Sequence, residues 1–153
     1  TGHRDAVTAL PDPYAKARAA REGAFPLGSA EGLAFYAYDD DKGAALDRGC
    51  TYSLSGNSPN SRFWTLYAAD RSLLPLNPGA GRQPALHSRQ ILRGANGAFV
   101  VAVSPRAQPG NWLATGGSGR MTLVMTLYDT PVGSNSGLVD MTFPAITRIG
   151  CDG

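Results

Sequence analysis

Large apolar residues fall at every second position of segment 120–128. Met121, Leu123, Met125 and Leu127 face one way, and the other face carries Arg120, Thr122, Val124, Thr126 and Tyr128. A repeat of two residues is that of a β-strand with one face against a hydrophobic core. Because the backbone N–H and C=O groups of such a strand need partners on neighbouring strands, this segment commits the chain to a β-sheet.

A glycine-rich segment, GNWLATGGSGR at residues 110–120, immediately precedes this strand. A glycine loop that binds phosphate opens onto a helix, whose first N–H groups and dipole hold the anion. Here residues 116–119 open onto a strand instead. We therefore interpret the segment as a bend between two strands, with glycines in left-handed backbone conformations.

Short strand patterns recur along the chain. They cover residues 33–38, 50–54, 62–67, 99–103 and 143–149. The 19 glycines and 11 prolines among 153 residues exceed the roughly 12% of average composition and favour short strands joined by tight turns. The Asn96-Gly97 pair predicts a type I′ hairpin that joins residues 89–92 to 99–103. Pro144 places the last strand at a sheet edge or at its own beginning.

One segment has a helical pattern, because Asp12 is a good N-cap, Pro13 suits the first turn, and an alanine-rich run ends at Gly23. With about eight strands and no helices between them, we predict an all-β, antiparallel, jelly-roll-like sandwich with this one short N-terminal helix. A single domain over residues 1–153 is expected, with the helix and an extended arm in 1–32 and the β-sandwich in 33–150.

Charge and hydropathy narrow the classes of partner. The formal charge of +2 comes from 14 basic and 12 acidic residues spread along the chain. No basic stripe typical of a nucleic-acid-binding protein is visible, so we expect no nucleic-acid partner. No window approaches the roughly 18 consecutive apolar residues of a membrane span. Because Thr1 is not an initiator methionine, an upstream targeting segment is expected.

The two cysteines, Cys50 and Cys151, allow two interpretations. In a cytosolic protein they would be reduced core residues, whereas in an exported protein an even count suggests a disulfide. Such a bridge would enclose about 100 residues, which the chain-entropy treatment values at up to roughly 4.7 kcal/mol.

Four motifs follow one another along the chain: YSLSG at 52–56, RFWTLY at 62–67, PGNWL at 109–113 and LVMTLY at 123–128. In this order and spacing they resemble the domain of unknown function family 1214, over about residues 50–150. The family's RFWSLTLYD run reads RFWTLYAAD here between Arg62 and Asp70, and this departure leaves the register of that strand open. The resemblance implies a jelly-roll-like sandwich but no particular reaction.

The chain is similar to the short, membrane-anchored bacterial members of this family, which have a cysteine before the YxLSG run and another at the C-terminus. The resemblance therefore implies a disulfide between Cys50 and Cys151. It also implies a periplasmic or cell-envelope location, tethered to the inner membrane by an N-terminal anchor outside this chain. Membrane contact is expected only through that anchor.

The sequence shows no clear catalytic or metal-binding arrangement. A serine or cysteine nucleophile needs a positioned base, but the histidines are His3 and His87, and a G-x-S-x-G motif is missing. The carboxylates of residues 39–41 lie beside Lys42, which is typical of a solvated turn rather than a calcium loop. No facing pair of carboxyl groups for glycoside hydrolysis can be chosen. We expect no metal and no cofactor.

The remaining candidates are aromatic and polar residues of the family-like motifs. The predicted ligand-binding set is Arg62, Trp64, Tyr67, Asn111, Trp112 and Arg120. The rings would stack on a sugar or an apolar ligand, and the arginines and the asparagine would donate hydrogen bonds. In the alternative interpretation the tryptophans fill the core, Asn111 satisfies loop backbone groups, and Arg62 pairs with Asp70 or Asp129.

The leading hypothesis is a non-catalytic envelope module that binds a small molecule, a glycan or an envelope protein. Two alternatives stay open, namely a hydrolase acting on envelope carbohydrate and a structural assembly domain that uses an exposed sheet edge. Two facing carboxylates in a cleft would favour the hydrolase, an aromatic concave patch would favour binding, and an open edge or flat apolar patch would favour assembly.

Overall fold

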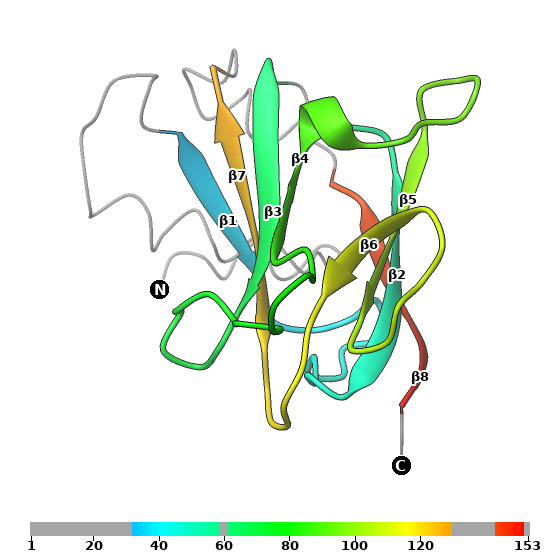
Figure 1. Ribbon diagram of the computed structural model, residues 1–153. Helices are drawn as coiled ribbons and strands as arrows, with labels where there is room; N and C mark the ends of the chain where they lie inside the picture. Colours follow the sequence, from blue (N-terminus) through cyan, green and yellow to red (C-terminus); the bar gives the residue numbers. More distant parts are fainter. Residues whose placement is uncertain (1–31, 59–60, 130–142, 152–153) are drawn as a thin grey trace.

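Two four-stranded sheets make up the fold in the computed structural model, which describes residues 32–58, 61–129 and 143–151. The first sheet has the order β1-β7-β3-β4, with bounds Leu33–Ala37, Thr122–Tyr128, Phe63–Ala69 and Ala85–His87. The second has the order β6-β5-β2-β8, with bounds Asn111–Ala114, Phe99–Ser104, Cys50–Gly56 and Ala145–Cys151. A 3-10 turn, η2 (Ser88–Gln90), follows β4. Figure 1 shows the two sheets on opposite sides of the molecule.

The core lies between the sheets because apolar side chains alternate inward along the strands. In β2, Cys50, Tyr52 and Leu54 are buried, which confirms the face predicted for them. In β3, Trp64 and Leu66 are buried on the inner face. The all-β, sandwich-like class predicted from the sequence is therefore confirmed.

Strand β7 differs from its prediction in one respect. The alternation at 120–128 indicates one buried face, yet Thr122 and Val124, on the other face, are also buried. Because β7 lies between β1 and β3, Val124 has Tyr36 and Tyr67 as its cross-strand neighbours. Large rings on both sides of a small residue remove it from solvent, which a pattern within one strand does not reveal.

The prediction of purely antiparallel sheets is wrong for one strand pair. Strand β6 runs parallel to β5, with Val101 opposite Asn111 and Val103 opposite Leu113, so the second sheet is mixed. The other pairs are antiparallel. The jelly-roll connectivity and the single-domain boundaries stay predictions, and the expected helix at residues 12–22 lies outside the described residues. No helix within the described residues is long and apolar enough to cross a membrane.

The type I′ hairpin predicted at Asn96-Gly97 is also wrong. Residues 88–90 form η2 rather than a strand, and the turn runs from Gly94 to Gly97, whose N–H donates to the Gly94 carbonyl at 3.0 Å. Gly97 has φ 85°, whereas Asn96 is outside the positive-φ region that a type I′ turn requires. Asn96 instead accepts the N–H of Ala98 through its Oδ1 at 3.1 Å, the local side-chain-to-backbone bond of an Asx turn.

The glycine-rich segment at 110–120 is part strand and part turn. Residues 111–114 form β6, which the sequence interpretation as a bend missed. The turn that follows is confirmed, with φ 83° at Gly117 and 108° at Gly119. Arg48 lies against this turn, and its Nε donates to the Gly116 carbonyl at 2.6 Å.

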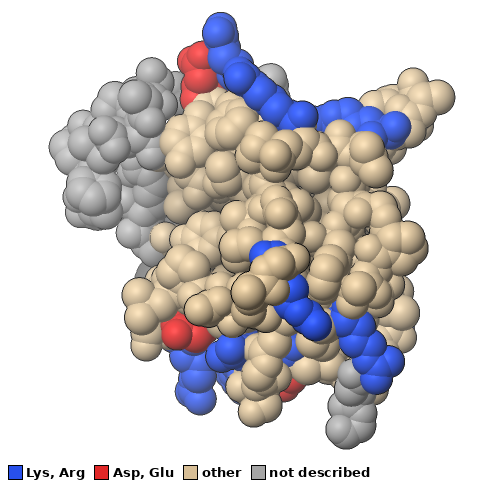
Figure 2. Space-filling view, in the orientation of Figure 1, with Lys and Arg blue, Asp and Glu red and all other residues tan. Residues whose placement is uncertain are grey.

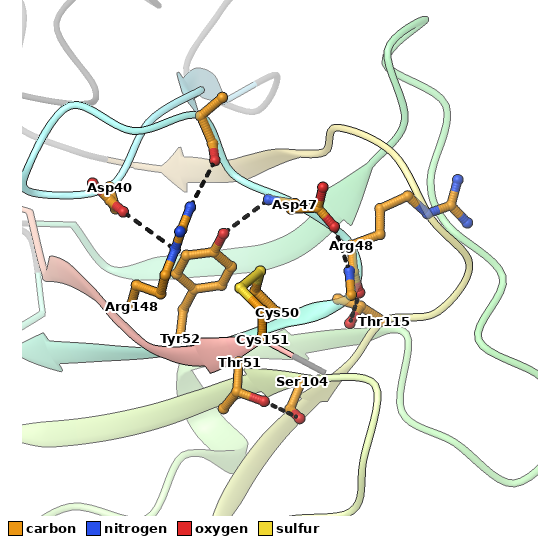
Figure 3. The surroundings of a disulfide bond; sticks show 12 residues. Asp40, Asp47, Arg48, Cys50, Thr51, Tyr52, Ser104, Thr115, Arg148 and Cys151 are labelled. Carbon is orange, nitrogen blue, oxygen red and sulfur yellow. Dashed lines mark hydrogen bonds and ion pairs between the residues drawn. A yellow bond between two sulfur atoms is a disulfide. The ribbon is translucent and has the colours of Figure 1, made fainter. Parts of the chain in front are cut away.

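The disulfide between Cys50 and Cys151 is present, and it joins directly opposed residues of β2 and β8. Figure 3 shows the polar groups around it. The N–H of Asp47 donates to the Tyr52 hydroxyl at 2.8 Å, and Thr51 and Ser104 share a hydrogen bond of 2.8 Å. The bridge ties β8 to β2 at the edge of the second sheet. Pro144 immediately precedes β8, so both places predicted for it, a sheet edge and the beginning of the strand, agree with the structure.

Candidate ligand-binding site

The structure does not gather the six predicted ligand-binding residues into one cluster. Trp64 has 0% exposure, and its ring packs on Phe99 with centroids 5.4 Å apart. Tyr67 lies three positions further along β3, and an odd spacing in a strand puts it on the opposite, outer face. Whether these residues bind a ligand stays a prediction, but Trp64 belongs to the core and offers no surface platform.

Trp112 lies on a different sheet, half-buried in β6. Its Nε1 donates to the Ser104 carbonyl at 3.0 Å, and the guanidinium of Arg82 lies 5.6 Å from its ring centroid. The Arg82 Nη1 also donates to the Pro105 carbonyl at 2.8 Å. These contacts fix β6 and the loop before it. Trp112 belongs to the second sheet, whereas Trp64 and Tyr67 belong to the first.

Arg62 and Arg120 lie at opposite ends of the β3–β7 pair. Arg62 precedes Phe63, which pairs with Tyr128, whereas Arg120 precedes the end where Ala69 pairs with Thr122. Arg62 forms an ion pair with Asp129, with 2.8 Å between Nε and Oδ2, as the alternative interpretation of the sequence predicted. Arg120 is exposed and forms a backbone bridge with Asp47.

Two further arginines, Arg89 and Arg93, lie at the same end of the sandwich as Arg62. We call Arg62, Arg89 and Arg93 the arginine end. Arg89 belongs to η2, and its guanidinium lies 5.3 Å from the centroid of the Phe63 ring. Arg93 is tied to η2 through a hydrogen bond from its Nη2 to the Ser88 carbonyl at 3.0 Å. Figure 2 shows a run of basic side chains along this edge of the molecule, with acidic atoms beside one extremity.

Two guanidinium groups of the arginine end, those of Arg89 and Arg93, lie over aromatic rings. Arg93 lies 5.7 Å from the centroid of the Phe99 ring, and its Nη1 donates to Ser58 Oγ at 2.7 Å. The ring of Phe63, under Arg89, also packs on His87 and Tyr128, with centroids 5.4 and 5.8 Å away. A guanidinium stacked on a ring is oriented while several of its N–H groups stay available to an incoming anion.

Asn111 fixes the segment that connects these arginines to β5. Its Oδ1 accepts the Leu92 N–H at 2.8 Å, and its Nδ2 donates to the carbonyls of Leu92 at 3.0 Å and Val100 at 2.9 Å. Ile91 is buried, whereas Leu92 is 66% exposed. The predicted role of Asn111 in satisfying loop backbone is thus confirmed, and its effect is to present Leu92 between Arg89 and Arg93.

The described carboxylates serve mainly local structure. Asp40 and Asp70 each accept two backbone N–H groups of their own turns, and Asp47 accepts the Gly49 N–H. Within residues 32–58, 61–129 and 143–151, no group of three or more His, Cys, Asp or Glu side chains could hold a metal ion. The geometry of the arginine end therefore supports binding of an anion more directly than it supports acid–base chemistry.

Sequence reasoning missed Arg89, Leu92 and Arg93. The hairpin predicted around Asn96-Gly97 treats residues 89–92 as a strand, in which charged residues would simply face solvent. The available signal for a binding site was the apolar pair Ile91-Leu92 with an arginine on either side. Their convergence with Arg62 depends on η2 and on the rings beneath, which no local pattern indicates.

Fold and site together define a disulfide-closed, two-sheet β-domain with a basic end. The chain belongs to the family described as protein of unknown function (DUF1214), whose profile matches residues 31–132. A search of curated proteins gives no match.

Two solved structures resemble the chain. The VPA0106 protein from Vibrio parahaemolyticus has 18% identity and a TM-score of 0.70, with 84% of this chain and 33% of that chain covered. A putative uncharacterized protein from Burkholderia cenocepacia has 16% identity and a TM-score of 0.48, with coverage of 77% and 29%. This chain spans about a third of the length of the Vibrio protein, and the likeness to that protein concerns the fold alone.

Proposed function

We propose that this domain is a non-catalytic binding module of the bacterial cell envelope, and that the arginine end is its binding surface for anionic groups. The observation that carries the proposal is the orientation of Arg89 and Arg93 on the rings of Phe63 and Phe99. Among the residues that the structure describes, Asp129 pairs with Arg62. Oriented guanidinium groups lose little conformational freedom when they bind a phosphate or carboxylate.

The disulfide supports the proposed location. A bridge between Cys50 and Cys151 forms and persists in an oxidising compartment such as the periplasm. We place the domain there, tethered to the inner membrane by a segment on the N-terminal side. A jelly-roll connectivity, as in other small-ligand and glycan-binding sandwiches, is part of the same proposal.

A thermal-shift experiment with soluble anions tests the binding function. The oxidised protein is titrated with inorganic polyphosphate and with an acidic oligosaccharide, and the same titration is made on Arg89→Gln/Arg93→Gln. Saturation at a hundred times the dissociation constant adds about 2.7 kcal/mol to the free energy of unfolding of the wild type. The double variant should lose this gain.

The matched control is Arg71→Gln/Arg120→Gln, which removes two exposed arginines away from the arginine end. It should keep the full shift. If both double variants lose the thermal shift to the same extent, binding depends on net charge alone, and the proposed surface is wrong.

A further inference from the structure

We infer that the anionic groups met by the arginine end are the headgroups of a phospholipid surface, and that Leu92 inserts among them. This inference rests on the proposed binding function and names its partner. It goes beyond a simple tether, because it gives the folded domain a face of its own toward the bilayer.

Leu92 is the residue that favours a membrane over a soluble anion as the partner. Its side chain is 66% exposed, the largest value among the large apolar residues described. An isolated exposed leucine is ordinary. This one, however, lies one residue from Arg93 and three from Arg89. Basic residues that flank an exposed apolar side chain are the composition of interfacial membrane-binding surfaces.

The backbone at Leu92 is fixed before any ligand arrives. Asn111 holds both its N–H and its C=O, and the buried neighbour Ile91 anchors the segment to the core. A soluble anion would gain nothing from a leucine held outward. A bilayer gains from it, because the apolar side chain leaves water at little further cost in conformational entropy.

The point at which the chain enters the first sheet agrees with an arginine end that faces the bilayer. Strand β1 begins with Leu33 opposite Leu127, one residue from the Phe63–Tyr128 pair beside the arginine end. The polypeptide therefore joins the first sheet at the arginine end. A membrane tether on the N-terminal side, as proposed above, would therefore enter the first sheet at the same end as the arginines.

Co-sedimentation with lipid vesicles tests the inference on the intact, oxidised chain. Vesicles of phosphatidylglycerol with phosphatidylcholine should bind the wild type at low salt, and vesicles of phosphatidylcholine alone should not. Each arginine near an anionic surface contributes about fivefold to the partition coefficient, so Arg89→Gln/Arg93→Gln should weaken binding by about 25-fold. Leu92→Ala should weaken it by about tenfold.

The far end of β3 supplies matched controls, since it presents an exposed arginine and an exposed leucine in the turn after Ala69. Arg71→Gln and Leu74→Ala remove groups of the same kinds, and Leu74 is 61% exposed. Both should bind vesicles within about twofold of the wild type. Salt should abolish the arginine effect but leave the Leu92 effect, because only the charge interaction is screened. Circular dichroism melting of each variant confirms that it is folded.

The outcomes are separable. Loss of vesicle binding in the Leu92 and arginine variants, with both controls intact, supports the inference. Arginine-dependent binding of soluble polyphosphate or acidic oligosaccharide without vesicle binding, or vesicle binding unchanged by Leu92→Ala, overturns the lipid inference and leaves the proposed function standing. Absence of binding to vesicles and soluble anions alike overturns both.

Discussion

The guanidinium of Arg48 lies directly under Gly117, so that a Cβ on Gly117 would fall 2.7 Å from the Arg48 Nη2. Gly117 has φ 83°, and Arg48 is held in place by the 2.6 Å hydrogen bond from its Nε to the Gly116 carbonyl. The turn before β7 thus depends on glycine at position 117 and on the charged Arg48 side chain beneath it.

Gly117→Ala should destabilise the fold more than a typical change at a left-handed glycine. The positive φ costs about 1–2 kcal/mol, and displacement of Arg48 breaks a charged hydrogen bond, for roughly 1.5 kcal/mol more. Gly43→Ala is the control, since Gly43 has φ 85° but a Cβ added there would have no atom within 4 Å. Urea unfolding measures both, and equal losses would show that Arg48 adjusts freely.

Removal of the disulfide should lower the free energy of unfolding by about 2–4 kcal/mol, because the bridge closes a large loop in the unfolded chain. The residues it joins are 101 positions apart. Cys50→Ser/Cys151→Ser and the chemically reduced wild type should unfold at the same, lower urea concentration. If reduction leaves the midpoint of the wild type unchanged, the bridge contributes nothing to stability.

Loss of the Asn111 side chain should loosen the segment around Leu92. Asn111→Ala removes three hydrogen bonds to backbone groups and should cost about 1–3 kcal/mol. The amide hydrogen of Leu92 should then exchange faster with solvent. Asn77→Ala, which removes one hydrogen bond to the Gly79 N–H in an exposed turn, should cost under about 0.5 kcal/mol. Unchanged protection at Leu92 would contradict the role assigned to Asn111.

Stability should fall as the pH rises above about 10. Burial raises the pKa of Tyr67 above its ordinary 10.0, and the nearby Tyr36 and Tyr128 raise it further. Burial followed by Tyr36 does the same for the pKa of Tyr38. As the pH rises, the unfolded chain therefore loses these protons first. The contribution of the two protonated tyrosines to the free energy of unfolding is complete below pH 10 and is lost above it.

Tyr67→Phe removes one of these groups and should flatten the alkaline decline in the free energy of unfolding, measured by urea titration at several pH values. An absorbance titration of the phenolates in the folded protein checks the direction of the shift. A decline as steep in the variant as in the wild type would assign the alkaline instability to other residues.

Sequence alone predicted those elements whose signal is local. The alternation around Leu123 and Met125 defined β7, and the positions of Cys50, Tyr52 and Leu54 defined the inner face of β2. Trp64 was placed in the ligand-binding set, and its burial agrees with the alternative interpretation in which the tryptophans fill the core. The disulfide came from the family resemblance rather than from spacing.

The remaining features depend on residues distant in sequence. The parallel pairing of β6 with β5 joins Val101 to Asn111 across a connection that carries no pattern of its own. The site was predicted only where arginine and asparagine lie next to tryptophan motifs, at Arg62 and Asn111. The guanidinium groups of Arg89 and Arg93 are oriented by the rings of Phe63 and Phe99, which belong to different sheets.

The pairing of β2 with β8 also sets an order of events during biosynthesis. A chain synthesised from its N-terminal end presents the Cys50 thiol long before its partner, since the two cysteines are 101 positions apart. Until then β2 lacks one of its two neighbours. The second sheet is therefore completed only when β8 pairs with β2 and brings Cys151 opposite Cys50.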